Sequence, residues 1–359
     1  MKIRSWGAVV DSDKNIWMPV LGTNKMLKRE PSGNISIVGE LKSDAHKNAA
    51  NSILKCFCIG DEVYLFSRLS YEMWVLGSNS LRIRHLTYCE KECKGISDIA
   101  IVGKKVCVFP VSFDCPLITV DLNTLDRREI PWTNNPYGGN ASFIRAQRAG
   151  QYIYTATRRK DDVYICEFNT EDEGVAFYQL DVRMINCIYV GIKDYWAFVL
   201  KKNGDTVLQK YENGFRNLKE EFVLGDIDSI DETGKLYYFN LFLYGELVYF
   251  IPSAAERIYV YNHRTKEGFF ADYPEGVTDS GKCEDGLTFA DTQHEGNMVY
   301  IFPHYFNQCI KLNLKDLSME TIDFKYSDAL VCNVLKGDAI LHEGDIAGLD
   351  DLIKLVTYN

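Results

Sequence analysis

The 359-residue sequence lacks any run of eighteen consecutive apolar residues and has no charged-then-apolar N-terminal stretch. A membrane-spanning helix needs about 20 consecutive apolar residues, so the sequence predicts neither a transmembrane helix nor a secretory signal. Proline is scarce as well, with nine residues against 26 glycines, which excludes a collagen-like chain. We therefore expect a soluble, cytoplasmic globular protein.

An excess of positive charge is also missing. Fifty acidic residues against 40 basic ones give a formal net charge of −10. Nucleic acids and anionic membranes attract proteins with a positive surface, so we expect neither as a partner. Hydrophobic residues make up 46% of the chain and aromatic residues 13%, which is enough to build a large folded core and excludes disorder as the main state.

The eleven cysteines are odd in number, and several lie inside apolar segments such as 54–59. This pattern is typical of buried thiols in a reducing compartment, so we expect free cysteines rather than a disulfide framework.

Short motifs that mark common enzyme classes are absent: the sequence has no Gly-x-Ser-x-Gly, His-Glu-x-x-His, phosphate-binding glycine loop or Cys-x-x-Cys. Asp11-Ser12-Asp13 begins like a calcium loop, but Ile16 and Gly22 replace the glycine and glutamate that such a loop needs. Cys56 and Cys58 share one strand face without the further ligands of a metal site. We expect no metal and no cofactor.

An internal repeat dominates the sequence. The phrase Gly-x-x-Val-(Tyr/Cys)-apolar-apolar-Pro occurs at 103–110, 245–252 and 296–303, with looser copies at 12–19, 60–67 and 150–157 and a degenerate one near 195–199. Successive copies end 42 to 53 residues apart, which is near the spacing of four-stranded propeller blades. An apolar segment precedes most copies, and an alternating segment ending in Asp or Asn follows, where turn chemistry leads into another strand.

These features predict an all-β protein, a seven-bladed β-propeller with four-stranded antiparallel blades. We expect one propeller domain over 4–345, with units near 4–44, 51–90, 96–132, 141–181, 185–224, 236–274 and 286–325. Residues 329–335 and 339–341 look like further strands within 329–343, which either close the ring or begin a partial eighth blade. The tail 346–359 has apolar residues at helical spacing and predicts a short C-terminal helix.

The units 236–269 and 286–323, with Val-Tyr-Phe-Ile-Pro followed by Ile-Tyr-Val-Tyr-Asn, resemble the repeats of kelch-like seven-bladed propeller proteins from gut Firmicutes. This resemblance implies the fold but carries no function residue by residue, since that group is uncharacterised. The one Gly-Gly pair, Gly138-Gly139, does not recur in each blade as in true kelch repeats, and no Trp-Asp dipeptide supports a WD-type repeat.

In a propeller, the loops joining the second and third strands share one rim with the loops between blades. Cationic and aromatic residues follow each phrase and gather on this predicted rim, where they suit an anionic ligand or a stacked sugar or peptide group. The candidate rim residues are Arg68, Tyr71, Trp132, Tyr137, Arg158, Arg159, Arg257, His304 and Tyr305, with Phe113, Lys201 and Phe306 nearby. Polar loops contain such residues in any case.

Three functions remain open. The first is a non-catalytic binding propeller that recognises a protein segment or a glycan through its rim. The second is an enzyme of the lyase or glycoside-hydrolase kind acting on an anionic sugar or small molecule, with His304, Tyr305, Asp98 and Asp291 as weak catalytic candidates. The third is a structural or assembly subunit. The sequence leaves the choice between enzyme and binding protein, the partner's identity and the oligomeric state open.

Overall fold

In the computed structural model, the described residues are 2–5, 7–21, 23–43, 53–77, 83–89, 95–136, 142–159, 162–228, 237–253, 255, 257–274, 277, 289–335 and 346–347. They form an all-β, seven-bladed propeller of four-stranded antiparallel blades with one short helix, as the repeat predicted. Contacts divide the chain into two compact units, so the expectation of one domain over 4–345 stays a prediction.

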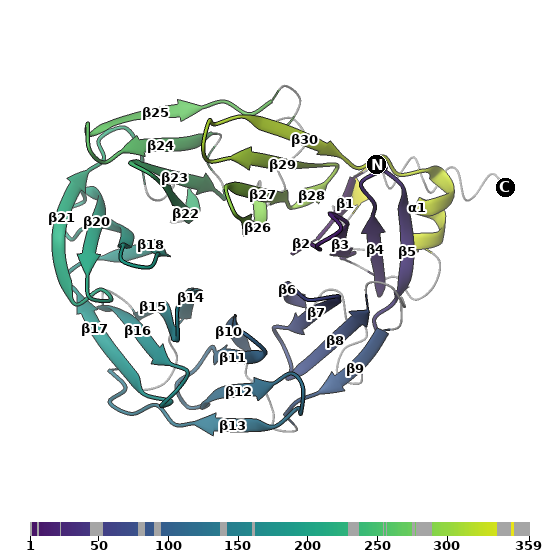
Figure 1. The fold of residues 1–359 in the computed structure, drawn as a ribbon, viewed down its shortest axis with the longest axis horizontal. Helices are drawn as coiled ribbons and strands as arrows, with labels where there is room; N and C mark the ends of the chain where they lie inside the picture. The colour runs from purple at the N-terminus through teal and green to yellow at the C-terminus, as the bar shows by residue number, and fades with distance from the viewer. Residues whose placement is uncertain are drawn as a thin grey trace. The chain divides into compact units, whose positions relative to one another are not determined.

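Unit 1 comprises Met1–Ser67, Tyr71–Thr87 and Tyr273–Asn359 and holds blades 1, 2 and 7 (Figure 1). Blade 1 is β2 (Val9–Val10), β3 (Ile16–Pro19), β4 (Lys25–Arg29) and β5 (Ile35–Glu40). Blade 2 is β6 (Ile53–Ile59), β7 (Glu62–Ser67), β8 (Glu72–Gly77) and β9 (Ile83–Thr87). Blade 7 is β26 (Phe289–Glu295), β27 (Met298–Pro303), β29 (Gln308–Asn313) and β30 (Met319–Asp323).

Unit 2 comprises Arg68–Ser70 and Tyr88–Asp272 and holds blades 3 to 6. Blade 3 is β10 (Ile96–Val102), β11 (Lys105–Pro110), β12 (Leu117–Asp121) and β13 (Arg127–Ile130). Blade 4 is β14 (Ser142–Ala149), β15 (Tyr152–Arg159), β16 (Asp162–Asn169) and β17 (Val175–Leu180). Blade 5 is β18 (Met184–Val190), β19 (Tyr195–Leu200), β20 (Thr206–Glu212) and β21 (Asn217–Val223). Blade 6 is β22 (Tyr238–Tyr244), β23 (Leu247–Pro252), β24 (Ile258–Asn262) and β25 (Glu267–Ala271).

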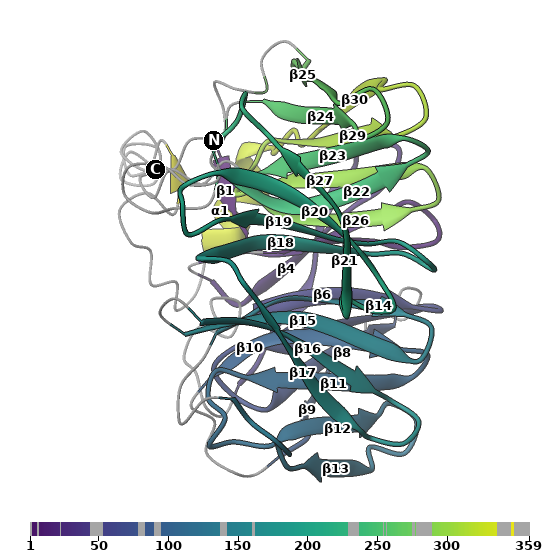
Figure 2. The same cartoon turned by 90° about the vertical axis from the view of Figure 1, so that its left-hand side faces the viewer.

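Strand order in every blade follows the sequence, and neighbouring strands are antiparallel, as in β15, β16 and β17 (Figure 2). The repeated phrase is the second strand of each blade together with the turn before it. Its glycine occupies the first position of a two-residue turn at φ near +60° in five blades, a conformation that favours glycine. Those glycines are Gly60, Gly103, Gly150, Gly245 and Gly296.

The predicted Asp and Asn turns between third and fourth strands are confirmed. Asp121 accepts hydrogen bonds from the backbone N–H groups of Asn123 and Thr124, and these bonds lower the pKa of its carboxyl. Asn262 accepts the corresponding bonds from Arg264 and Thr265, at 2.9 and 3.1 Å. A side chain that bonds its own turn in this way fixes the hairpin without help from the core.

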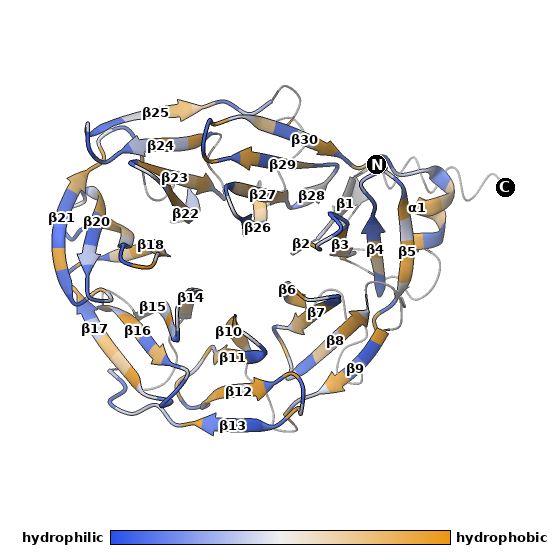
Figure 3. Ribbon diagram, in the orientation of Figure 1, coloured by the Kyte–Doolittle hydropathy of each residue, from blue (hydrophilic) through white to orange (hydrophobic). Residues whose placement is uncertain are grey.

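Middle strands are buried and outer strands are exposed. In blade 3, β12 is almost wholly buried and mostly orange in Figure 3, whereas β13 is mostly exposed and blue. Apolar clusters join successive blades: one joins blades 1 and 7 through Ile16 and Tyr300, and another joins blades 4 and 5 through Tyr154 and Phe215. The aromatic residues of these clusters therefore supply packing between blades.

First strands carry a recurring bulge: six blades have a register shift there, which lies between the first two residue pairs in blades 2, 3, 6 and 7 and further along the strand in blades 4 and 5. Further along two of these strands, a glutamine amide bridges to the next blade. Gln147 accepts from Val190 N at 2.9 Å and donates to Ile188 O at 2.5 Å. Gln293 accepts from Val10 N at 2.6 Å and donates to Val10 O at 2.9 Å. These glutamine side chains thus bond to the backbone of the next blade, in addition to the apolar contacts between blades.

The C-terminal region corrects one prediction. Residues 329–335 were expected to form a strand, but α1 (Asp328–Leu335) is a helix. Ser327 begins it, because its hydroxyl accepts the Leu330 N–H at 3.2 Å in the manner of a helix N-cap. Leu330 and Val334, four residues apart, then join the apolar cluster of blades 1 and 7. The strand predicted at 339–341 and the apolar positions of the helix predicted in 346–359 lie outside the described residues.

A further sheet of three short strands was not predicted. β1 (Lys2–Arg4) lies between β28 (Tyr305–Phe306) and β31 (Ile346–Ala347), antiparallel to both. The first strand of blade 1, β2 (Val9–Val10), begins five residues after β1 ends. Both partners of β1 belong to unit 1, so this sheet ties the two ends of the described chain to blade 7.

Candidate functional site

The predicted rim residues of unit 2 are partly engaged in structural contacts. Trp132 donates its indole N–H to Cys115 O at 2.6 Å and stacks on Phe143, with ring centroids 5.4 Å apart. Arg257 is exposed, with its guanidinium 4.5 Å from the Phe270 ring centroid.

Arg68 is exposed, and its carbonyl accepts the Ile96 N–H at 2.7 Å. Arg158 and Arg159 end β15, and the structure describes only their backbone. Tyr137 lies outside the described residues.

Rim residues of unit 1 are buried where their side chains are described. Tyr71 is 4% exposed and His304 is 0% exposed, so neither side chain reaches solvent in this conformation. The His304 carbonyl accepts the Ser5 N–H at 3.1 Å, which places His304 beside the chain that follows β1. Tyr305 pairs with Arg4 in the three-stranded sheet, and only its backbone is described. Their roles at a site remain predictions.

The two candidate acids lie directly after the bulges of first strands, in different units. Asp98 and Asp291 each accept the backbone N–H of the following residue at 2.8 Å, and both are nearly buried, at 4% and 8% exposure. Asn240 makes the same contact in blade 6. An amide serves there as well as a carboxylate does, so this shared position has a structural role in the bulge.

A cavity of about 930 Å³ lies in unit 1 between blades 7 and 1. Its walls are the β2–β3, β4–β5 and β26–β27 turns, together with residues of β27, β29 and β30. The charged residues that line it are Lys14, Arg29, Lys311, Lys325, Glu295, Glu320 and Asp323, and the larger apolar and aromatic ones are Met298, Tyr300 and Ile322. Its size lies within the range of ligand-binding pockets.

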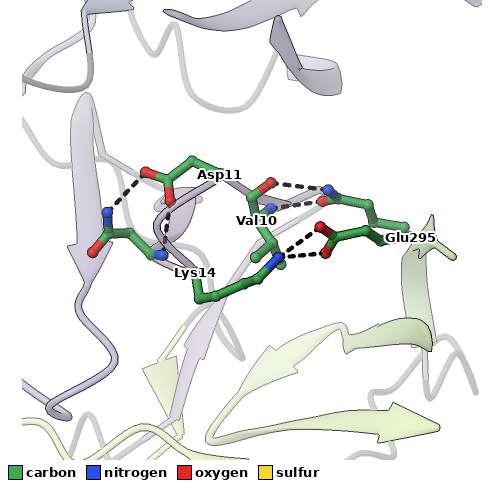
Figure 4. A network of polar contacts seen from close by, with 6 residues as sticks. Val10, Asp11, Lys14 and Glu295 are labelled. Carbon is green, nitrogen blue, oxygen red and sulfur yellow. Dashed lines mark hydrogen bonds and ion pairs between the residues drawn. The ribbon is translucent and has the colours of Figure 1, made fainter. Parts of the chain in front are cut away.

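Two ion pairs neutralise part of this charge. Lys14 and Glu295 point toward each other at the edge of the cavity, with Nζ 2.6 Å from Oε1 (Figure 4). Lys311 lies 3.3 Å from Glu320. Asp11, next to this edge, is occupied by its own turn, since it accepts from the side chain of Asn15 at 2.8 Å. The charges on the cavity wall are thus mostly arranged as pairs.

Arg29 is held by backbone groups instead of a carboxylate. Its Nε donates to Asp323 O at 2.8 Å, one Nη donates to Glu30 O at 3.1 Å, and its guanidinium lies 5.4 Å from the Phe324 ring centroid. Carbonyl oxygens fix the orientation of a guanidinium without cancelling its charge. Arg29 therefore presents an oriented positive charge to the cavity.

Tyr300 lines the cavity and is only 4% exposed. Burial raises the pKa of its phenol; Lys14 and Lys311 oppose this shift, and Glu295 adds to it. The hydroxyl consequently stays protonated at neutral pH and can donate a hydrogen bond. It does not supply a general base.

The sequence did not lead to this cavity. It directed attention to His304, beyond the C-terminal end of β27, whereas the cavity reaches Gly296 and Met298 at the strand's other end. A signal does exist: the β4–β5 turn, Glu30-Pro31-Ser32-Gly33-Asn34, contains no aromatic or large apolar side chain. The turn can be recognised as part of a cavity only in the folded structure, where β30 lines the same cavity.

No group of three or more His, Cys, Asp or Glu residues suited to a metal ion occurs in the part of the chain that the structure describes. Within the same part, no helix has the length and hydrophobicity needed to cross a bilayer.

Comparison with known proteins shows the fold. No protein-family model and no curated protein matches the sequence. Among solved structures, virginiamycin B lyase from Staphylococcus aureus aligns with a TM-score of 0.61 at 10% identity, covering 85% of this chain and 94% of the lyase. YCF48 from Cyanidioschyzon merolae aligns at 0.60 and 10%, covering 88% and 97%. The RRP9 WD40 repeats align at 0.55 and 11%, covering 83% and 87%.

At such low identity the likeness defines a class by architecture alone, the seven-bladed β-propellers. The neighbours include a lyase and a set of WD40 repeats, so they do not distinguish an enzyme from a binding protein. The predicted kelch-like relationship and its bacterial group stay predictions.

Proposed function

We propose that this protein is a non-catalytic binding propeller that holds an extended protein segment in the cavity between blades 7 and 1. One observation carries the proposal: β30 is the outermost strand of its blade, and four consecutive residues of it, 320–323, line the cavity. An outermost strand offers backbone donors and acceptors along its outer edge, to which an extended segment can add as a further strand; at the end of β30, the Asp323 carbonyl is already bonded to Arg29.

A protein segment fits this cavity better than a glycan does. Sugar rings bind by stacking on exposed aromatic faces, and Tyr300, the one aromatic residue among the lining residues, is 4% exposed. The catalytic alternative has less support, because the Lys14 and Lys311 charges are paired with carboxylates and Tyr300 stays protonated. The cavity therefore offers contacts along a chain more than a general base.

Binding can be measured by fluorescence anisotropy with labelled synthetic peptides of alternating Thr and Glu or Gln residues. The same peptides N-methylated at alternate residues test strand addition, because they lack donors for the β30 edge. Ser32→Trp places a large ring at the exposed β4–β5 turn, and Asn203→Trp makes the same change in an exposed turn of unit 2. We expect Ser32→Trp and N-methylation each to weaken binding by about tenfold or more, and Asn203→Trp to leave it unchanged.

Peptides recovered intact by mass spectrometry support a binding protein, whereas a cleaved or altered peptide supports the enzyme alternative. If no peptide binds, or if binding ignores both Ser32→Trp and N-methylation, the proposal is wrong. Binding of a neutral oligosaccharide that Ser32→Trp abolishes, without peptide binding, would replace the protein segment by a glycan.

A further inference from the structure

Charge on the cavity wall is not balanced. The pairs Lys14–Glu295 and Lys311–Glu320 account for four of the seven charged lining residues. Arg29, Lys325 and Asp323 remain, which leaves a formal surplus of one positive charge. The Asp323 carboxylate accepts from the Gln308 amide at 3.1 Å, a neutral donor. In a chain of net charge −10, such a surplus, which includes the oriented guanidinium of Arg29, is a local exception.

At the junction between blades 4 and 5, side chains fill the position that corresponds to the cavity between blades 7 and 1. There Tyr154 pairs with Glu167 in register, as Tyr300 pairs with Lys311 in blade 7. Glu167 is nearly buried and accepts from Arg216 at 2.7 Å, and this arginine comes from the β20–β21 turn of the next blade. The preceding residue of that turn, Phe215, packs its ring against Tyr154.

In blades 7 and 1 the same positions carry different chemistry. Lys311 stands where blade 4 has the acid Glu167, so the sign of the charge is reversed. In the β4–β5 turn, Gly33 and Asn34 stand directly before β5, as Phe215 and Arg216 stand directly before β21, and the cavity lies beside this turn. By analogy with Arg216 opposite Glu167, a group that fits opposite Lys311 carries negative charge.

The Glu320 partner of Lys311 does not prevent this. Its side chain is 72% exposed, and ion pairs with exposed partners are weak because water screens them. A bound anion shielded from water competes well with such a partner. Among the described residues, Arg29 uses its N–H donors for two carbonyl bonds and has further donors to offer, and Lys325 adds a second positive charge.

We infer that the segment held by this cavity is acidic, with a carboxylate or phosphoryl group recognised by Arg29 and Lys325. The inference rests on the proposed binding function and specifies its ligand. Carboxylate and phosphoryl groups share the planar or branched oxygen geometry that a guanidinium grips with two parallel hydrogen bonds.

The test compares labelled peptides of one backbone that carry Glu, Gln or phosphoserine at the same positions, with inorganic phosphate as a competitor. Arg29→Gln and Lys325→Gln remove the two proposed contacts separately. Lys202→Gln removes the same charge from an exposed ion pair with Asp181 in unit 2 and serves as the control. Lys325 is exposed, so its replacement keeps the test valid if Arg29→Gln perturbs folding.

We expect the Glu or phosphoserine peptide to bind about tenfold or more tightly than the Gln peptide, and to lose that advantage in Arg29→Gln and Lys325→Gln. Added salt should weaken this binding, and Lys202→Gln should not. Displacement of the Glu peptide by millimolar phosphate supports an anion site and assigns free phosphate as a ligand.

Equal binding of the Glu and Gln peptides, still blocked by Ser32→Trp, would overturn the acidic ligand and leave the binding function in place. Absence of binding by any peptide would overturn both.

Discussion

The reactivity of a single residue in this propeller depends on how deeply the residue is buried. Cys107 is in the second strand of blade 3 and is 0% exposed. Burial raises the pKa of its thiol to about 12, and Lys105 opposes the shift. Because the thiolate is the reactive form, such a cysteine is inert while the protein is folded.

We predict that iodoacetamide at about pH 8 leaves Cys107 unmodified in the folded protein and modifies it after unfolding in urea. Half-buried Cys115 should react faster in the folded state. The free energy of unfolding should also fall from about pH 9 to pH 12, because the unfolded thiol ionises there before the folded one. Mass spectrometry of tryptic peptides measures the labelling, and equal rates at both cysteines would contradict the prediction.

Arg216 differs from ordinary surface arginines because its partner is buried. Glu167 has 8% of its side chain exposed and also accepts from the Tyr178 hydroxyl at 3.1 Å. Removing the cation leaves that carboxylate without its counter-charge. We predict that Arg216→Met lowers the free energy of unfolding by about 2 kcal/mol, less than for a fully buried pair because Arg216 is half exposed.

Arg264→Met, which breaks an exposed pair with Glu246, is the matched control and should leave the free energy of unfolding nearly unchanged. Urea denaturation of both variants measures the difference. Equal losses would mean that Glu167 is hydrated in solution.

Among the structural elements, the inner hairpin was the most predictable. The Gly-x-x-Val-Tyr phrase located the second strands because its glycine is required by the turn and its apolar residues by the core. The helix at 328–335 was mistaken for a strand because an apolar segment such as Ala329-Leu330-Val331 fits a strand as well as a helix. The Ser327 cap was the signal that distinguishes the helix from a strand. The three-stranded sheet was missed because pairing between distant short segments leaves no local pattern.

The cavity was equally out of reach, since it depends on the combination of a small turn in blade 1 with an outermost strand in blade 7. Lys14, Arg29 and Lys325 read as ordinary surface residues in a single sequence. Only the register of Tyr154 with Glu167 and of Tyr300 with Lys311 makes the two junctions comparable.

The glycine of an inner hairpin can be tested directly. Gly245 has φ +60° and no atom near the place of an added Cβ, so the cost of Gly245→Ala is conformational. We predict a loss of about 1 kcal/mol in the free energy of unfolding. Gly225→Ala, equally open but without a positive φ, should be neutral or slightly stabilising. Similar urea midpoints for both variants would show that the turn does not hold its left-handed conformation.

At the scale of the whole molecule, the described ends of the chain meet in the sheet of β28, β1 and β31. Ile3 pairs with Phe306 on one side and Ile346 on the other. A proline there removes a donor from a strand with partners on both sides. We predict that Ile3→Pro speeds hydrogen exchange at the amides of 305–306 by about tenfold or more and lowers the melting temperature.

Ile3→Val keeps the donor and should exchange like the parent protein. Unchanged exchange in Ile3→Pro would show that this sheet contributes little to the folded state in solution.

The β4–β5 turn carries a consequence for how such a protein diverges. None of Glu30, Pro31, Ser32, Gly33 or Asn34 belongs to the apolar cluster that joins blades 1 and 7, yet Pro31, Ser32 and Gly33 border the cavity. Substitutions there change what the cavity admits while the core stays intact. Changes in a single loop can therefore reshape this cavity without disturbing the fold, so shared architecture alone is a poor guide to shared ligands.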